Sequence, residues 1–243
     1  MARVAIFLYG IACYAVSLVV FIYGAGFFVG FGTPTMLDGT PTRPFTEALA
    51  INVGLLAAFA IQHSGMARPG FKRWWTRFVP ESAERSTYLL FSNIAMVAIY
   101  YYWAPMGGVI WKVPEGNAYI AVLALYGFGW ALLLLATFLI NHFDLFGLEQ
   151  VWRKLTGRTD RVQKFHTPLL YKLVRHPIYV GWLIIFWAAP VMTGAHLVFA
   201  LGLTIYILIA IRLEERDLID AFGKQYTDYI DRTPMLVPGL RRR

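Results

Sequence analysis

Six apolar runs dominate this sequence and restrict how the chain can fold. Of its 243 residues, 58% are hydrophobic and only 15% are charged, against about 25% charged in an average soluble domain. This balance excludes an ordinary water-soluble domain and intrinsic disorder. A helix needs roughly 20 apolar residues to cross a bilayer, and the first four runs reach or approach that length. The runs cover residues 4–31, 45–62, 87–104, 118–140, 178–192 and 196–211.

The last two runs are the shortest. Only residues 193–195 separate them, which is typical of a tight helical hairpin with both ends on one side. We therefore predict an all-α integral membrane protein with five to six transmembrane segments, the last two forming a short helical hairpin followed by a cytoplasmic C-terminal tail. Without a polar linker, residues 1–243 should form one domain, with four transmembrane helices in 1–140 and a loop, the hairpin and the tail in 141–243.

The basic residues predict the orientation of these segments. Of the 22 lysines and arginines, only Arg43 and Lys112 lie in the two loops that would face outward. Lysine and arginine collect in the cytoplasmic loops of membrane proteins, so both termini are expected in the cytoplasm. The cytoplasmic side then carries the longer loops and four of the five histidines. The terminal Arg241–Arg243 is interpreted as an anchor to anionic lipid.

Several functional classes are disfavoured. The formal net charge is +8, but the basic residues lie between apolar runs, so no nucleic acid is expected as a partner. The single cysteine, Cys13, excludes a disulfide framework and a cysteine-based zinc site. The sequence contains no P-loop, G-x-G-x-x-G or H-E-x-x-H motif. It also lacks the internal repeat that would favour an inverted-repeat transporter.

The segment R-H-P-I-Y-V-G-W at 175–182 is typical of a helix N-terminus that binds a ligand. Pro177 suits the first turn of the helix that follows. Donors from Arg175 and His176 before that turn, and from Tyr179 within it, would hold an anion against the helix N-terminus. An interfacial belt of Arg, Tyr and Trp explains the same residues equally well.

An acidic segment, R-L-E-E-R-D-L at 212–218, follows the last apolar run. The hairpin would bring Glu214 and Glu215 near His176 and Tyr179. Acidic side chains at a helix C-terminus oppose the macrodipole, which favours a ligand-binding purpose over the alternative, a solvated charged face. Carboxylates suit ribose hydroxyls, an amino group or a nearby cation.

The tail contains F-G-K-Q-Y-T-D-Y at 222–229, with aromatic residues four and three positions apart on an expected short helix that ends before Pro234 and Pro238. This helix would pack over a cofactor as a lid. An amphipathic helix lying at the membrane interface is the alternative.

Together these C-terminal segments resemble the isoprenylcysteine carboxyl methyltransferase-like superfamily of membrane methyltransferases. The shared features are R-H-P-x-Y-x-G-W, the short hairpin, the E-E pair, F-G-x-x-Y-x-x-Y and a closing P-x-x-x-P. The resemblance implies a site for S-adenosylmethionine (AdoMet) between the loop before the hairpin and the tail after it. It also implies neither a Rossmann domain nor a metal.

The resemblance assigns a cofactor pocket residue by residue. The implied AdoMet-binding residues are His166, Thr167, Pro168, Leu169, Tyr171, His176, Pro177, Tyr179, Glu214 and Glu215. Two features depart from the superfamily pattern. Leu169 replaces the usual glycine two residues before Tyr171. Ile209 and Ala210 replace an arginine that serves the carboxylate substrate of prenylcysteine enzymes, which argues against that substrate.

The N-terminal two thirds resemble the methanethiol S-methyltransferase family within this superfamily. The shared stretches are Q-H-S-G-M-A-R-P at 62–69, R-W-W at 73–75, E-R-S-T-Y at 84–88 and N-H-F-D-L-F-G-L-E-Q at 141–150; NnrU-type proteins share part of this pattern. The implied reaction transfers a methyl group from AdoMet to methanethiol, a small thiol, giving dimethyl sulfide and S-adenosylhomocysteine. The implied location is the bacterial inner membrane, with the active site on the cytoplasmic side.

Three residues are candidates for the catalytic base. A thiolate attacks far faster than a thiol, so a group that takes the thiol proton would help. His142 and Asp144 follow the fourth apolar run, and His63 follows the second. Each could accept a proton directly or through water. For each of them, structural hydrogen bonding at the interface is the alternative.

Two other functions are compatible with the sequence. One is a membrane methyltransferase that acts on a larger lipid or a prenylcysteine. The other is a non-enzymatic membrane protein of the NnrU type. Affinity for AdoMet distinguishes the enzymes from the latter, and the methylated product distinguishes the two enzymes.

Overall fold

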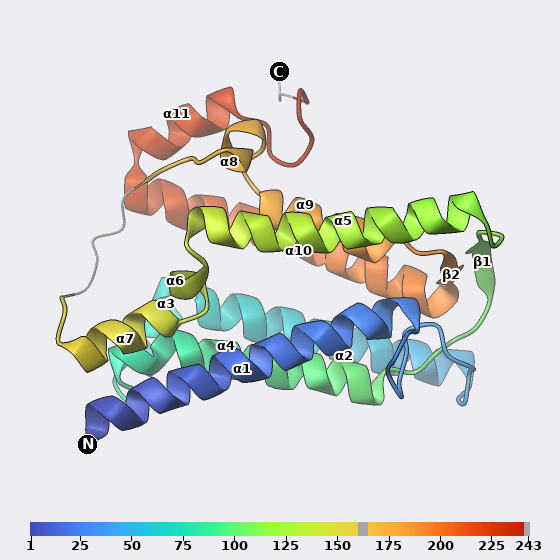
Figure 1. Ribbon diagram of the computed structural model, residues 1–243, viewed down its shortest axis with the longest axis horizontal. Coiled ribbons are helices and arrows are strands. Elements are labelled where there is room, and N and C mark those ends of the chain that lie inside the picture. The colour runs from blue at the N-terminus through green and yellow to red at the C-terminus, as the bar shows by residue number, and fades with distance from the viewer. Residues whose placement is uncertain (160–164, 241–243) are drawn as a thin grey trace. The chain divides into compact units, whose positions relative to one another are not determined.

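The computed structural model describes residues 1–159 and 165–240, which are mostly helical (Figure 1). Within these residues, four helices are long and apolar enough to cross a membrane. They are α1 (Ala2–Val29), α2 (Phe45–Ala67), α5 (Asn117–Ile140) and α10 (Gly194–Phe222). This confirms the prediction of an all-α integral membrane protein. The predicted lipid anchor, Arg241–Arg243, lies outside the described residues.

Two further helices coincide with the remaining apolar runs. Helix α4 (Glu81–Tyr102) begins six residues before its run, with Glu81 and Glu84 in its first turn. Acidic side chains are favourable there because the N-terminal end of a helix carries partial positive charge. Helix α9 (Pro177–Trp187) has only 11 residues. Each of the six apolar runs therefore contains a helix, although the fifth run is helical only as far as Trp187.

Short elements connect the long helices. The short helices are α3 (Pro69–Trp75), α6 (His142–Leu145), α7 (Leu148–Thr156), α8 (Leu170–Leu173) and α11 (Lys224–Arg232). A small antiparallel sheet, absent from the sequence prediction, pairs β1 (Val109–Lys112) with β2 (Val191–Thr193). The backbone N–H of Gly194 bonds the carbonyls of Gly107 and Gly108 at 3.0 and 2.9 Å. Both of these glycines have φ near +70°, which L-residues rarely adopt.

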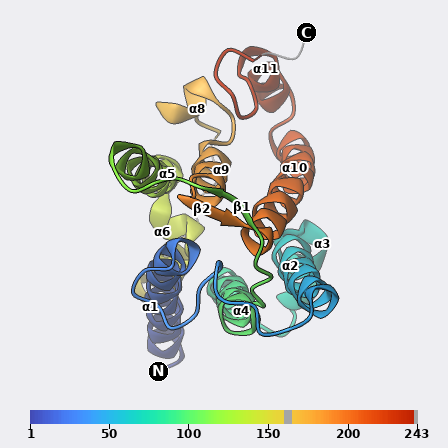
Figure 2. The ribbon, with the colours of Figure 1, turned by 90° about the vertical axis from the view of Figure 1, so that its right-hand side faces the viewer.

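The chain divides into two compact units, and the first comprises residues 1–112, 143–159 and 190–202. In this unit α1 packs against α4 and α7, while α2 packs against α4. Figure 2 shows α1, α4 and α2 from their ends. Gly10 lets α1 approach α7 closely, because a Cβ atom there would lie 2.6 Å from Val151. A buried hydrogen bond of 2.7 Å from Asn93 to Ser17 joins α4 to α1.

The second unit comprises residues 113–142, 165–189 and 203–240. Its principal contact is α5 against α9. Gly181 makes this contact possible, because a Cβ atom there would lie 2.9–3.0 Å from the backbone of Leu133 and Gly129. The indole N–H of Trp187 donates to Thr204 Oγ1 at 3.0 Å and so joins the end of α9 to α10. Helix α9 and this part of α10 form the expected hairpin.

The hairpin differs from the prediction at two points. The connection is longer than residues 193–195, because α9 ends at Trp187 and β2 precedes α10. Helix α10 also continues past the apolar run to Phe222, so Glu214 and Glu215 lie about two turns inside it. The macrodipole argument for these two acids was therefore wrong. Glu, Arg, Leu and Ala are good helix formers, and they sustain the helix beyond its apolar part.

Candidate active site

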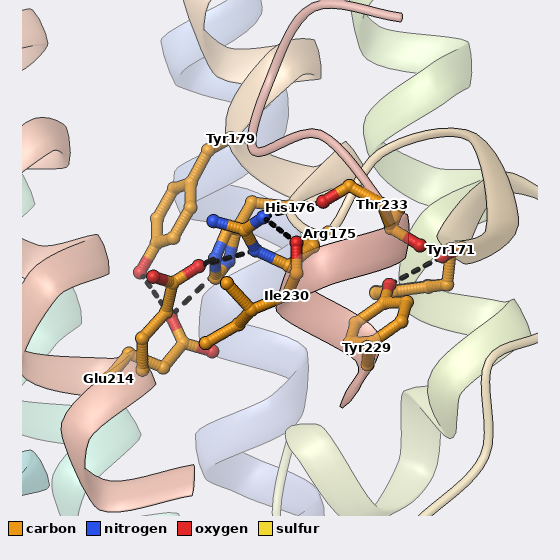
Figure 3. Close-up of polar contacts among 9 residues, drawn as sticks. Tyr171, Arg175, His176, Tyr179, Glu214, Tyr229, Ile230 and Thr233 are labelled. Atoms are coloured by element: carbon orange, nitrogen blue, oxygen red, sulfur yellow. Dashed lines mark hydrogen bonds and ion pairs between the residues drawn. The ribbon is translucent and has the colours of Figure 1, made fainter. Parts of the chain in front are cut away.

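Polar side chains from the start of α9 and from the acidic part of α10 lie within hydrogen-bond distance of one another (Figure 3). We call Arg175, His176, Tyr179, Glu214 and Glu215 the polar cluster. His176 Nε2 lies 2.9 Å from Glu215 Oε1, and the Tyr179 hydroxyl donates to Glu214 Oε2 at 3.0 Å. Pro177 occupies the first turn of α9, as predicted. Residues at the start of α9 and in the acidic part of α10, which the predicted hairpin was expected to bring together, thus form one site.

The two carboxylates of the cluster have different surroundings. Glu215 Oε1 is shared by Arg175 Nε at 2.7 Å and by the ring of His176. Its charge is therefore already compensated within the protein. The Glu214 side chain is 43% exposed, and its Oε1 has no partner among the described residues. Of the two acids, Glu214 is the one available to a ligand.

Arg175 links the cluster to the tail. Its Nη1 donates to the carbonyls of Ile230 at 3.2 Å and Thr233 at 2.5 Å, at the end of α11. The backbone N–H groups of Arg175 and His176 donate to the carbonyls of Pro234 and Met235. The tail that follows α11 is therefore fixed against the start of α9. The sequence indicated Arg175 as a donor for an anion, but its guanidinium is occupied by protein groups.

Replacing Arg175 with glutamine should release this tail. The substitution leaves Glu215 half-buried with one partner fewer and removes both bonds to the tail carbonyls, which should cost about 3 kcal/mol. We expect a lower unfolding temperature and faster limited proteolysis after α11. Arg216→Gln, at an exposed position of α10, is the matched control. Equal proteolysis of the two variants would show that Arg175 does not hold the tail.

Aromatic residues pack beneath the tail helix. The Phe165 ring lies 5.5, 5.8 and 5.4 Å from the rings of Phe222, Tyr226 and Tyr229. The expected single helix over residues 222–229 is interrupted at Gly223, because Phe222 ends α10 and α11 begins at Lys224. Aromatic residues of both helices thus lie around Phe165, a residue that the sequence analysis did not single out. Burial raises the pKa of Tyr226 and Tyr229 above the ordinary value, so both phenols stay neutral at physiological pH.

Tyr171 lies between α5 and α11. Its hydroxyl donates to the carbonyl of Ala136 on α5 at 3.3 Å, and its own carbonyl accepts a hydrogen bond from the Tyr229 hydroxyl. Burial raises the pKa of the Tyr171 phenol, and the charge of Glu214 adds to this. Tyr171 therefore positions α8 between α5 and the tail helix.

The preceding loop contains the other implied cofactor residues. His166 and Leu169 are exposed, and Thr167 and Pro168 are half-buried. The Pro168 carbonyl accepts a hydrogen bond from the Tyr171 N–H at 2.8 Å, which forms the turn into α8. Leu169 lies in this turn with φ of +35°. Glycine is favoured at such a φ, so the departure from the superfamily pattern places a strained leucine in the turn.

Leu169→Gly should therefore stabilise the protein. The leucine is 69% exposed, so its removal loses little buried area, while relief of strain should contribute about 1 kcal/mol. Thermal unfolding should shift upward by about 2–4 °C. The matched control is Leu173→Gly in α8, at an exposed helical position where glycine costs about 1 kcal/mol. A fall of equal size in both variants would contradict the assignment of strain.

Of the three candidate bases, His142 belongs to the same unit as the polar cluster. It is only 4% exposed. Its Nδ1 lies 2.9 Å from Thr137 Oγ1, and its ring stacks on Phe138 with a centroid distance of 4.2 Å. Burial lowers the pKa of His142 below the ordinary value of 6.5, so the imidazole is neutral at pH 7.

The other two candidates belong to the first unit. His63 Nε2 lies 2.9 Å from the Tyr88 hydroxyl, and His63 Nδ1 lies 3.0 Å from Ser92 Oγ. Asp144 Oδ1 accepts a hydrogen bond from Gln150 at 3.1 Å. Both residues thus have structural hydrogen bonds. Within the described residues, no group of three or more His, Cys, Asp or Glu side chains could hold a metal ion.

Curated proteins resemble this chain over nearly its whole length. Methanethiol S-methyltransferase 1 of Bradyrhizobium diazoefficiens is 48% identical over 97% of this chain and 82% of its own. Methanethiol S-methyltransferase of Mycobacterium tuberculosis is 48% identical over 100% of this chain and 99% of its own. Nurim of Xenopus laevis is 28% identical over 84% of this chain and 81% of its own. No protein-family model and no solved structure matches the chain.

Proposed function

Because this chain belongs to the methanethiol S-methyltransferase family, we propose that it transfers a methyl group from AdoMet to methanethiol. The products are dimethyl sulfide and S-adenosylhomocysteine. The observation that carries the proposal is 48% identity to two curated proteins of that name over nearly the whole chain. The chain covers 82% and 99% of those two relatives, so the aligned regions span both the N-terminal stretches and the segments that carry the polar cluster.

The polar cluster is chemically suited to AdoMet. The Oε1 atom of Glu214 and the partial exposure of its side chain suit an amino group or ribose hydroxyls, which need acceptors. The first turn of α9, with Pro177 at its start, offers backbone N–H groups for a carboxylate. We assign Glu214 as the principal acidic contact. Tyr179 orients its carboxylate, and Glu215 holds His176 and Arg175 in place.

AdoMet, when bound, supplies a methyl group on a positively charged sulfur. The residues of this chain have three tasks: to hold the donor, to exclude water and to take the thiol proton. The negative charge of Glu214 favours a cationic ligand. The closely packed aromatic residues of the tail exclude water from that side. Much of the rate enhancement then comes from positioning the thiol in line with the methyl group.

We assign the proton-accepting role to His142. Its imidazole is neutral at physiological pH, so one ring nitrogen carries a lone pair that can accept a proton. It lies in the unit that contains the polar cluster, and Ala136, next to Thr137, accepts the hydrogen bond of Tyr171. In the reaction the electron pair of the S–H bond stays on the thiol sulfur and forms the new C–S bond to the methyl group, and the electron pair of the methyl–sulfonium bond that breaks leaves with S-adenosylhomocysteine. The proton passes to the imidazole.

We further propose that the enzyme lies in a bacterial inner membrane with its site facing the cytoplasm. Arg43 and Lys112 alone fall in the outward loops, which supports this orientation. The polar cluster also follows a basic loop and precedes a basic tail. Methanethiol is small and lipid-soluble, so it would reach such a site from the bilayer or from the cytosol.

The test uses the purified full-length protein in lipid nanodiscs. Incubation with methanethiol and AdoMet should release dimethyl sulfide, measured by headspace gas chromatography, and calorimetry should detect binding of S-adenosylhomocysteine. No affinity for either nucleotide would refute the methyltransferase proposal. Nucleotide binding without dimethyl sulfide, together with methylation of a longer lipid acceptor, would refute methanethiol as the substrate.

A further inference from the structure

Thr137 makes two contacts that together determine to which atom its hydroxyl group donates a hydrogen bond. Its Oγ1 lies 2.7 Å from the carbonyl oxygen of Leu134, one turn earlier on α5, and 2.9 Å from His142 Nδ1. Thr137 and His142 are 5% and 4% exposed. Both contacts are therefore shielded from solvent, and each must join a donor to an acceptor.

The single hydroxyl hydrogen of Thr137 can serve only one of the two contacts. A backbone carbonyl accepts and never donates, so the hydroxyl hydrogen must point to Leu134. Thr137 Oγ1 is then the acceptor of the second contact, and His142 Nδ1 must carry a hydrogen. In a neutral imidazole only one ring nitrogen is protonated. The lone pair of His142 therefore resides on Nε2.

We propose that Thr137 is a positioning residue that holds His142 as the Nδ1–H tautomer, so that Nε2 is the atom that accepts the thiol proton. This inference rests on the proposed function, because it assumes that His142 is the base. It adds a residue that the sequence analysis did not single out, and it specifies the reacting atom of the imidazole.

The local backbone is built to make this contact. Asn141 ends α5 with φ of +151°, and its N–H still bonds the Thr137 carbonyl at 3.1 Å. The chain turns sharply at Asn141, so His142 folds back over the last turn of α5. The Phe138 ring lies nearly parallel to the imidazole, with an interplanar angle of 6°. Thr137 thus fixes the tautomer while Phe138 restrains the plane of the ring.

The same arrangement also suits the protonated state. When Nε2 takes the proton of the thiol, the imidazolium carries hydrogens on both nitrogens. The Nδ1–H group continues to donate to Thr137 Oγ1, so this hydrogen bond does not have to be broken during the reaction. Return of the proton from Nε2 to water regenerates the base.

The test compares two substitutions at one position. Thr137→Val keeps the shape of the side chain but removes the acceptor, whereas Thr137→Ser keeps the hydroxyl. We expect kcat for dimethyl sulfide formation to fall about 10- to 100-fold in the valine variant, a part of what a general base contributes. Calorimetric affinity for S-adenosylhomocysteine should be unchanged, and the serine variant should stay within about threefold of wild type.

The tautomer can be read directly by ¹⁵N NMR of histidine-labelled protein in nanodiscs. The chain has five histidines, and the His142→Gln spectrum identifies the signals of His142. Wild type and the serine variant should show a protonated Nδ1 and an unprotonated Nε2. The valine variant should lose this preference. A purely structural role for Thr137 would lower stability without changing the tautomer.

The outcomes of these experiments distinguish a failure of the role proposed for Thr137 from a failure of the proposed function. A wild-type protein that forms no dimethyl sulfide refutes the function, whatever the tautomer. A wild-type protein that forms it while His142 is protonated on Nε2, or a valine variant with wild-type kcat, refutes the role of Thr137 alone. If the valine variant fails to fold, the wild-type spectrum still decides the tautomer.

Discussion

Glu214→Ala should abolish detectable AdoMet binding. The substitution removes the more exposed carboxylate of the polar cluster, together with the acceptor of the Tyr179 hydrogen bond. Hydrogen bonds to charged groups contribute about 1.5–3 kcal/mol each, so the loss of two ligand contacts should weaken binding about 100-fold or more. Calorimetric titration with S-adenosylhomocysteine measures this effect.

Two further variants test whether the loss of binding is specific to the Glu214 carboxylate. Glu214→Gln keeps the shape of the side chain and one oxygen acceptor, so its affinity should fall between those of wild type and the alanine variant. Asp220→Ala removes an exposed acid from the same helix and should leave binding unchanged. Wild-type affinity in Glu214→Ala would disprove the assignment of this residue.

His142→Ala should leave nucleotide binding intact and lower turnover. Removing the proton acceptor should reduce kcat about 10²- to 10⁴-fold, the usual contribution of a general base, with an unchanged affinity for S-adenosylhomocysteine. The measurement is the initial rate of dimethyl sulfide formation at saturating methanethiol and AdoMet.

Parallel variants at the other two candidates test this choice. His63→Ala and Asp144→Ala should retain a larger share of the wild-type kcat than His142→Ala does. If instead His63→Ala shows the largest loss and His142→Ala turns over at the wild-type rate, the base belongs to the first unit. The role proposed for Thr137 would then fail as well.

The apolar runs alone predicted much of the fold. Every run contains a helix, because a long uncharged segment in a membrane can satisfy its backbone only internally. Where helices end was harder to predict. The run ending at residue 211 gave no sign that α10 continues to Phe222, since the extension depends on helix-forming charged residues rather than on hydrophobicity. The β1–β2 pair depends on contacts between segments some 80 residues apart, which no local pattern records.

The polar cluster, too, was predictable from the sequence only in part. R-H-P-x-Y and E-E were recognisable because hairpin geometry brings the start of one helix beside a distant part of the next. The contacts of Arg175 with Ile230 and Thr233 join residues 55 and 58 positions apart. No local pattern therefore predicted that the Arg175 guanidinium donates to carbonyl groups of the tail. Thr137 was missed for another reason. Threonine is ordinary in an apolar helix, and only its distances to Leu134 and His142 reveal its role.

We propose that Glu214 and the start of α9 bind the nucleotide that carries the methyl group. An experimental structure of the full chain with S-adenosylhomocysteine bound would test this assignment. We expect a carboxylate oxygen of Glu214 within roughly 3 Å of a ribose hydroxyl or the amino group. A nucleotide bound away from the polar cluster, with Glu214 facing only lipid or solvent, would contradict it.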